Sequence, residues 1–145
     1  MTATETSLKN FQSDVDQWMA ENVPKNPGFL LPLTFLEVGT EQQLDFLRDW
    51  QHKLWSAGFL GMHWPTQYGG QGSDAAYQGI VDKALTAHNA PIIFNTIGLN
   101  WTGPLLLDVG TEEDRQRYIK NILTGDEIWC QGFSEPDHGS DLGAV

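Results

Sequence analysis

The sequence predicts a mainly α-helical protein, with an all-α bundle domain at residues 1–125 and the start of a β-domain at residues 126–145. Three observations carry this prediction. Apolar residues recur at spacings of three and four through most of the chain, which is the period of one helix face. Capping residues, prolines and glycines mark the ends of these segments. Only at residues 128–134, IWCQGFS, does the period change to two, as in a strand.

The first expected helix covers the N-terminal segment and ends before Pro24. Its apolar face consists of residues at helical spacing, namely Leu8, Phe11, Val15, Trp18, Met19 and Val23. The connector that follows, PKNPGFLLPL, contains too many helix-breaking residues to continue the helix.

The second helix is expected to begin at Thr40. Thr40 and Gln43 have the spacing of a capping box, in which each side chain satisfies a free amide of the first turn. The buried face of this helix is formed by Leu44, Leu47, Trp50, Leu54 and Trp55. Gly58 ends it in the left-handed conformation. After a glycine-rich loop at residues 59–72, Ser73 is expected to cap a third helix. The inner face of the third helix is formed by Tyr77, Ile80, Val81, Ala84 and Leu85.

Residues 91–109 are apolar almost all round, and small residues, Gly98 and Gly103, interrupt them. Helices of this kind are normally enclosed by others, so we expect an enclosed helix pair here. From periodicity alone, plain core packing is favoured over one wall of an apolar ligand cavity. Gly110 and Thr111 end this unit and cap the last helix, which Gly125 closes. The inner stripe of that helix is Tyr118, Ile119, Ile122 and Leu123.

Composition narrows the possible partners. The net charge is −11, from 19 acidic and 8 basic residues, so phosphate backbones and anionic lipid would be repelled and neither nucleic acid nor membrane insertion is expected. The single cysteine, Cys130, excludes an internal disulfide and is expected to be a buried, inert thiol. The N-terminus lacks the pattern of a secretory signal, which favours a cytoplasmic location. The histidines show no metal-ligand spacing, so no metal site is expected.

The stretch SEPDHGSD, taken by its composition, is a solvated turn. It is, however, similar to the T/S-E-P-x-x-G-S-D signature of the acyl-CoA dehydrogenases. The preceding GTEEDRQRYIKNILTGDEIWCQGFSEP resembles the helix and strand that lead to this signature, and FLGMHWPTQYGGQG resembles a loop of the same family. The resemblance therefore covers three motifs in order, over residues 40–145. It implies the family's N-terminal helical domain, followed by the first strand of a truncated middle β-domain.

The resemblance also implies a cofactor, a substrate and partners. FAD is expected to contact Gln131, Phe133, Ser134, Gly139 and Ser140, with the Ser134 hydroxyl at the flavin ring. Ser140 is also expected to contact the pantetheine arm of the acyl-CoA substrate. The acyl chain is expected against Ile93, Thr96 and Ile97, which raises the cavity interpretation above plain core packing. An electron-transfer acceptor and a homo- or hetero-oligomer are the other expected partners.

The expected reaction is α,β-desaturation of an acyl-CoA with hydride transfer to flavin N5. The catalytic base is expected beyond Val145, so no catalytic residue is assigned and the chain alone is expected to be inactive. The sequence departs from the family at Asp137 and His138, where small residues are usual, and this change would weaken FAD binding. Two alternatives stay open: a flavin oxidase or monooxygenase of the same fold, and a non-catalytic helical partner subunit or interaction module.

Overall fold

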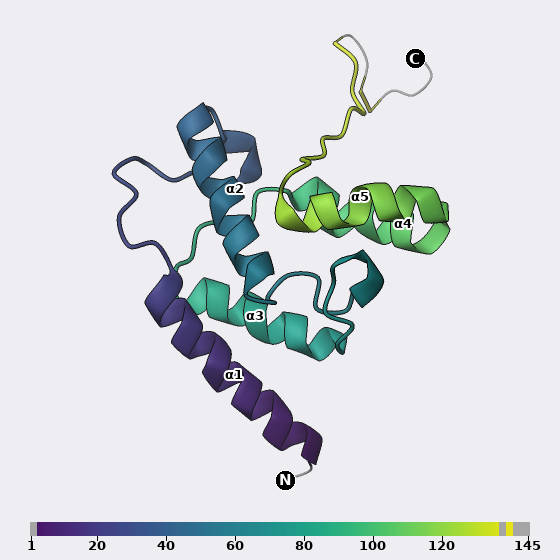
Figure 1. Ribbon diagram of the computed structural model, residues 1–145. Helices are drawn as coiled ribbons and strands as arrows, with labels where there is room; N and C mark the ends of the chain where they lie inside the picture. The colour runs from purple at the N-terminus through teal and green to yellow at the C-terminus, as the bar shows by residue number, and fades with distance from the viewer. Residues whose placement is uncertain (1–2, 137–138, 141–145) are drawn as a thin grey trace.

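The computed structural model describes residues 3–136 and 139–140, and no strand occurs among them. The main helices are α1 (Ala3–Asn22), α2 (Glu41–Ser56), α3 (Ala75–Ala87), α4 (Gly103–Val109) and α5 (Glu112–Thr124). Shorter turns in the connections are η1 (Phe35–Glu37), η2 (Thr66–Tyr68) and η3 (Gly98–Thr102). Figure 1 shows α1 packed along α3, α4 packed along α5, and α2 between these two pairs. The predicted helical fold is therefore confirmed.

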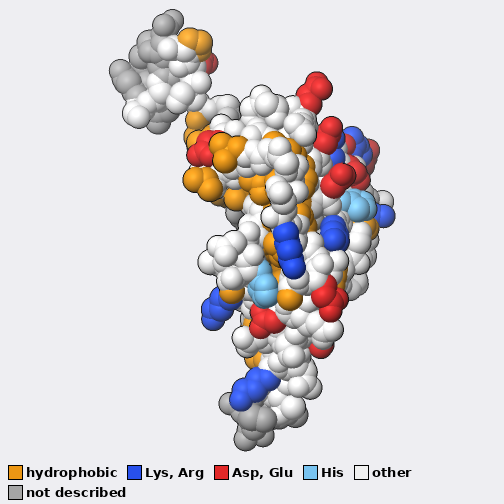
Figure 2. Space-filling model, turned by 90° about the vertical axis from the view of Figure 1, so that its left-hand side faces the viewer, with side chains coloured by type: hydrophobic (Ala, Val, Ile, Leu, Met, Phe, Trp, Pro, Cys, Tyr) orange, Lys and Arg blue, Asp and Glu red, His pale blue; other side chains and the backbone are white. Residues whose placement is uncertain are grey.

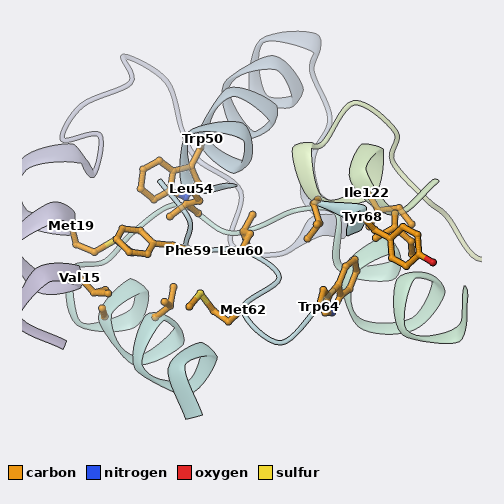
Figure 3. Close-up of a cluster of buried hydrophobic side chains, with 14 residues drawn as sticks. Val15, Met19, Trp50, Leu54, Phe59, Leu60, Met62, Trp64, Tyr68 and Ile122 are labelled. Carbon is orange, nitrogen blue, oxygen red and sulfur yellow. The ribbon is translucent and has the colours of Figure 1, made fainter. Parts of the chain in front are cut away.

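The core runs through all of these helices, from α1 at one end to α5 at the other (Figure 3). Much of its centre comes from the glycine-rich loop between α2 and α3 rather than from a helix. This loop buries Phe59, Leu60, Met62 and Trp64. Sequence patterning had marked this segment only as a connection, but it is the part of the chain that joins the two helix pairs.

Helix ends follow local signals, with two corrections. At α2, the Thr40 hydroxyl accepts the N–H of Gln43 as predicted, but the Gln43 side chain accepts the N–H of Gly39 at 3.0 Å instead of that of Thr40. Gln43 is drawn away because its amide also donates to the carbonyl of Leu30 at 2.9 Å, which fastens the α1–α2 connector to the helix. The predicted capping box is therefore only half formed.

The cap of α3 is Asp74, not Ser73. The Asp74 carboxylate accepts the N–H of Ala76 at 2.8 Å. Ser73 belongs to the preceding loop, because its N–H already donates to the carbonyl of Met62 at 2.7 Å. An acidic side chain at a helix N-terminus is also favoured by the helix dipole, which the serine would not exploit.

The predicted helix pair at 91–109 is wrong. Residues 91–95 are not helical, and a single helical run follows from Thr96 to Val109 through the π-helical turn η3. The run is not enclosed by the described residues either, since Trp101, Leu105 and Val109 are 54%, 59% and 71% exposed. These three are spaced four residues apart, so they form one apolar stripe on the outer face.

The π turn brings this helix against the core at its two glycines. A Cβ on Gly98 would lie 2.5 Å from Oδ1 of Asn95, and one on Gly103 would lie 2.1 Å from the indole ring of Trp64. Only residues without side chains allow this approach. The last helix, α5, forms as predicted: Thr111 and Asp114 make a complete capping box, Ile119, Ile122 and Leu123 are buried, and Gly125 ends it with φ +82°.

The segment after α5 differs from expectation. Residues 128–134 were expected to be a strand, but they run as an extended chain away from the helices, without a neighbouring strand among the described residues (Figure 1). A strand needs a second strand for its backbone hydrogen bonds. Cys130 is exposed, not buried as expected, although the neighbouring Trp129 packs against the core. The boundary between residues 125 and 126 stays a prediction.

Candidate functional site

An apolar groove of about 550 Å³ lies where the α1–α2 connector, the start of the 91–109 segment and the chain after α5 meet. One wall comes from the connector and the first turn of α2, and includes Phe35, Leu36, Val38 and Leu44. The floor is Phe94, which is 5% exposed, with Ile97 beside it. The opposite wall is Ile128, Trp129, Cys130 and Gln131. Residues distant in the sequence thus form one site.

This groove opens onto an apolar surface. Leu30, Leu33 and Leu36 of the connector are each more than 80% exposed. Figure 2 shows hydrophobic side chains gathered on the upper part of one face, below the C-terminal segment. Large apolar side chains that are this exposed on a protein surface mark a place for a ligand or another protein segment.

The residues predicted to hold the acyl chain do not all reach this groove. Ile97 lines it, whereas Ile93 and Thr96 line two smaller pockets on the other side of the segment, of about 320 and 500 Å³. Successive helical residues point about 100° apart, so Thr96 and Ile97 face different sides. The 320 Å³ pocket is more polar, because His63, Gln78, Asp82 and Asn100 contribute to it.

Of the residues predicted to contact the cofactor, the first lies in the groove wall and the later ones lie beyond it along the chain. Gln131 lines the groove, Phe133 is 82% exposed, and Ser134 and Ser140 are exposed. Gly139 lies close to Ser134, since a Cβ on Gly139 would lie 3.0 Å from Oγ of Ser134. Asp137 and His138, at which the sequence departs from the signature, lie outside the described residues.

Two buried amide side chains that the sequence analysis overlooked bind backbone carbonyls near the end of α5. Asn95 donates to the carbonyls of Ile122 at 3.1 Å and Glu127 at 3.0 Å, and accepts the N–H of Trp129 at 3.1 Å. Gln51 donates to the carbonyl of Ile122 at 2.8 Å and to that of Leu123 at 3.0 Å. The sequence did contain a signal for the role of Asn95, which directly follows the apolar run PIIF. An amide at such a position is expected to be buried, and a buried polar group needs hydrogen-bond partners.

Charged and aromatic contacts support the segment after α5. Arg117 pairs with Glu127 at 2.5 Å, and the Trp129 ring meets the Tyr118 ring edge-on at 5.4 Å between centroids. These contacts orient residues 127–129, which begin the groove wall. They leave the side chains of Gln131 and Phe133 exposed.

The N-terminus of α5 carries the groups with shifted pKa values. The Glu112 carboxylate accepts hydrogen bonds from the Tyr68 hydroxyl and the Gln116 amide, which lower its pKa. The hydroxyl and the backbone N–H of Thr111 lower the pKa of Asp114 in the same way. Both acids are structural, since they hold α5 to the glycine-rich loop and cap it.

Neither a metal cluster nor a membrane-spanning helix is found in the described part of the chain. No group of three or more His, Cys, Asp or Glu side chains is close enough there to hold an ion. None of its helices is both long and apolar enough to cross a bilayer.

Comparison with known proteins identifies close relatives. Residues 8–126 match the family described as acyl-CoA dehydrogenase, N-terminal domain. The chain is 34% identical over 139 residues to "Acyl-CoA dehydrogenase IpdE1" of Mycolicibacterium smegmatis, which covers 95% of this chain and 35% of that protein. The solved structure "Tcur3481-Tcur3483 steroid ACAD" superposes with a TM-score of 0.70 at 28% identity, over 97% of this chain and 34% of that one.

A second solved structure supports the fold alone. The ChsE4-ChsE5 complex from Mycobacterium tuberculosis superposes with a TM-score of 0.69 at 22% identity, over 100% of this chain and 34% of that one. The chain thus spans about a third of the length of the relatives it matches.

Proposed function

The chain belongs to the acyl-CoA dehydrogenase family, and we propose from this that it is the N-terminal part of an FAD-dependent enzyme that desaturates an acyl-CoA thioester between its α and β carbons. The observation that carries this proposal is the groove of about 550 Å³ with Ile97 at its floor and Gln131 on its wall. It brings a residue expected to hold the acyl chain beside the first residue expected to contact FAD.

The described part of the cofactor segment fits a flavin. Ser134 and Ser140 offer exposed hydroxyl groups, and Phe133 offers an exposed aromatic face. Gly139 packs so close to Ser134 that a larger residue would push against its hydroxyl. Hydroxyl and backbone N–H donors held in place around a ring stabilise negative charge without reorganising. When bound, FAD would supply the hydride acceptor for the reaction.

In this proposal, the residues that line the groove bind and orient the acyl group. Its walls are mostly apolar, and its volume lies within the range of about 300–1,000 Å³ typical of small-molecule sites. An acyl chain in the groove would displace water from Phe94 and Ile97 and lie beside Gln131. Ser140, further along, would donate a hydrogen bond to the pantetheine arm. No residue of the chain is assigned as the base.

Substrate bulk and assembly are further parts of the proposal. A structural relative at 28% identity is titled a steroid ACAD and named for two components. A wide apolar groove beside exposed leucines suits a bulky apolar acyl group better than a short one. We therefore include a large acyl group and an oligomeric protein in the proposal, together with an electron-transfer acceptor and the cytoplasmic location expected from the sequence.

The experiment compares Ser134→Ala with the matched control Ser56→Ala in the intact protein. Both serines are exposed, but Ser56 ends α2 and does not line the groove. Wild type should purify with the yellow absorption of a bound flavin and reduce an artificial electron acceptor with an acyl-CoA. Ser134→Ala should lower kcat by about tenfold or more, the loss expected when a donor to developing charge is removed. Ser56→Ala should match wild type. A colourless wild type that takes up no added FAD contradicts the proposal.

The non-catalytic partner subunit is the second candidate, and Asp137 and His138 favour it, because a carboxylate and a bulky ring stand where small residues are usual beside a pyrophosphate-bearing cofactor. Replacing both with Gly-Ala in the intact protein discriminates between the two. Under the partner-subunit hypothesis the wild type is colourless and the double variant binds FAD. Under the enzyme hypothesis the wild type already binds FAD. An enzyme of the oxidase or monooxygenase type would consume oxygen with the acyl-CoA.

A further inference from the structure

Asn95 is a fully buried polar residue in an apolar part of the molecule, and its side chain contacts two different segments. Its amide group donates to Ile122 near the end of α5 and to Glu127 just beyond it. Its amide oxygen accepts the N–H of Trp129. All of these partners are backbone groups, so the interaction does not depend on the side chains of residues 122–129. Asn95 therefore fixes the path of the chain itself.

The pattern of these bonds is that of a strand neighbour. In a parallel pair of strands, a residue bonds to both neighbours of the residue opposite it. Its N–H donates to the carbonyl of the preceding neighbour, and its carbonyl accepts the N–H of the following neighbour. The Asn95 side chain does the same around Ile128, because it donates to the carbonyl of Glu127 and accepts the N–H of Trp129. The carboxamide of Asn95 thus supplies the N–H and the carbonyl that one residue of a neighbouring strand would supply. This explains how the chain leaves the bend at Glu127 along a fixed path through Trp129, without a strand beside it in the described chain.

The backbone and the side chain of Asn95 are both held in place. Its carbonyl accepts the N–H of Leu99 at 2.9 Å, which ties its backbone to the first turn of the helical run. Gly98 leaves the space that its side chain occupies, since a Cβ there would meet the carboxamide at 2.5 Å. The carboxamide cannot turn elsewhere without losing all of its partners.

Two walls of the groove depend on this residue. Ile97 follows Asn95 by two positions, and Ile128 lies between the two backbone groups that Asn95 holds. We propose that Asn95 is a positioning residue, which substitutes for a strand at residues 127–129 and thereby sets where the cofactor segment leaves the helical domain. The link to the cofactor rests on the proposed function; the link to residues 127–129 does not.

The test compares Asn95→Ala with Gln51→Ala in the intact protein. Gln51 is the matched control because it is equally buried and also donates to the carbonyl of Ile122, but it does not reach residues 127–129. Backbone hydrogen exchange of Trp129 reports the positioning, and the dissociation constant for FAD reports its consequence. In Asn95→Ala, exchange at Trp129 should accelerate about tenfold or more beyond any change in α1 to α3, and FAD should bind about tenfold more weakly. Gln51→Ala should show neither selective change.

Unmodified protein provides a measurement that no folding defect affects: the Trp129 N–H should exchange more slowly than the N–H of Phe133. Equal exchange at these two positions overturns the proposal. So does a Gln51→Ala variant that matches Asn95→Ala at both readouts. A selective change at Trp129 with unaltered FAD affinity overturns the link to the cofactor. A wild type that binds no FAD, but shows the selective change at Trp129, contradicts the proposed function and supports the positioning role.

Discussion

Gly103→Ala provides the sharpest test of how the helical run packs on the core. An added Cβ would lie 2.1 Å from Cη2 of Trp64, 2.8 Å from Cζ2 of the same ring and 2.9 Å from the carbonyl oxygen of Gly98. Carbon atoms prefer a separation of about 3.5–4.0 Å. Trp64 is 3% exposed and surrounded by core residues, so its ring cannot move outward freely.

The expected magnitude follows from a comparison with Gly79→Ala. Gly79 lies within α3, and an added Cβ there would meet nothing within 4 Å. Each substitution gains the helix propensity of alanine over glycine, about 1 kcal/mol. This gain cancels in the difference between the two variants, which leaves the overpacking cost of about 1–3 kcal/mol at Gly103. Gly79→Ala should therefore raise the free energy of unfolding by about 1 kcal/mol, and Gly103→Ala should be about 1–3 kcal/mol less stable than Gly79→Ala.

Urea unfolding followed by far-UV circular dichroism measures both free energies, and an unchanged dependence on urea shows that the unfolded states are comparable. The refuting result is a Gly103→Ala protein as stable as Gly79→Ala. That outcome would mean that Trp64 does not pack tightly against the helix at Gly103.

Other predictions concern the core and the N-terminus of α5. Leu54→Ala should lower the free energy of unfolding by about 2–5 kcal/mol, because the Leu54 side chain is fully buried. Leu105→Ala, at a 59% exposed position, should change it by less than about 0.5 kcal/mol in this chain. Equal losses in urea titrations of the two variants would contradict the assigned core. Tyr68→Phe should remove the main cause of the lowered pKa of Glu112. Because that pKa is lowered in the folded state, the stabilisation is present above the ordinary value of 4.5 and disappears as pH falls through the lowered one. The stability difference between Tyr68→Phe and wild type should therefore shrink from pH 6 towards pH 3; a constant difference would contradict this assignment.

Local structure was largely predictable from the sequence, and the errors have local causes too. Thr111 predicted the start of α5 because a capping residue acts within one turn, and the structure adds Asp114 as the second member of a capping box. Ser73 was predicted as the cap of α3, but the adjacent Asp74 is an equally good capping residue. The cap falls to Asp74 because the Ser73 N–H already donates to the carbonyl of Met62. The close packing of Gly103 on the Trp64 ring could not be foreseen, because the two residues are far apart in the sequence.

The site was predictable only in part. The FSEPDHGSD motif singled out residues 131–140 through resemblance, and the groove wall includes Gln131. Ile93, Thr96 and Ile97 were grouped through the family resemblance of the 91–109 segment, yet they line different pockets. Asn95 was overlooked because its partners lie 27 to 34 residues away, and no periodic pattern reports contacts at that distance.

The sequence alone determined which segments are helices, where most of them end and which faces they bury, since these properties depend on side chains within a few turns of one another. The tertiary structure alone decided the groove. Its walls come from the connector before α2, from Ile97 and from the chain after α5, and they meet because buried polar groups such as Asn95 must find backbone partners across the fold.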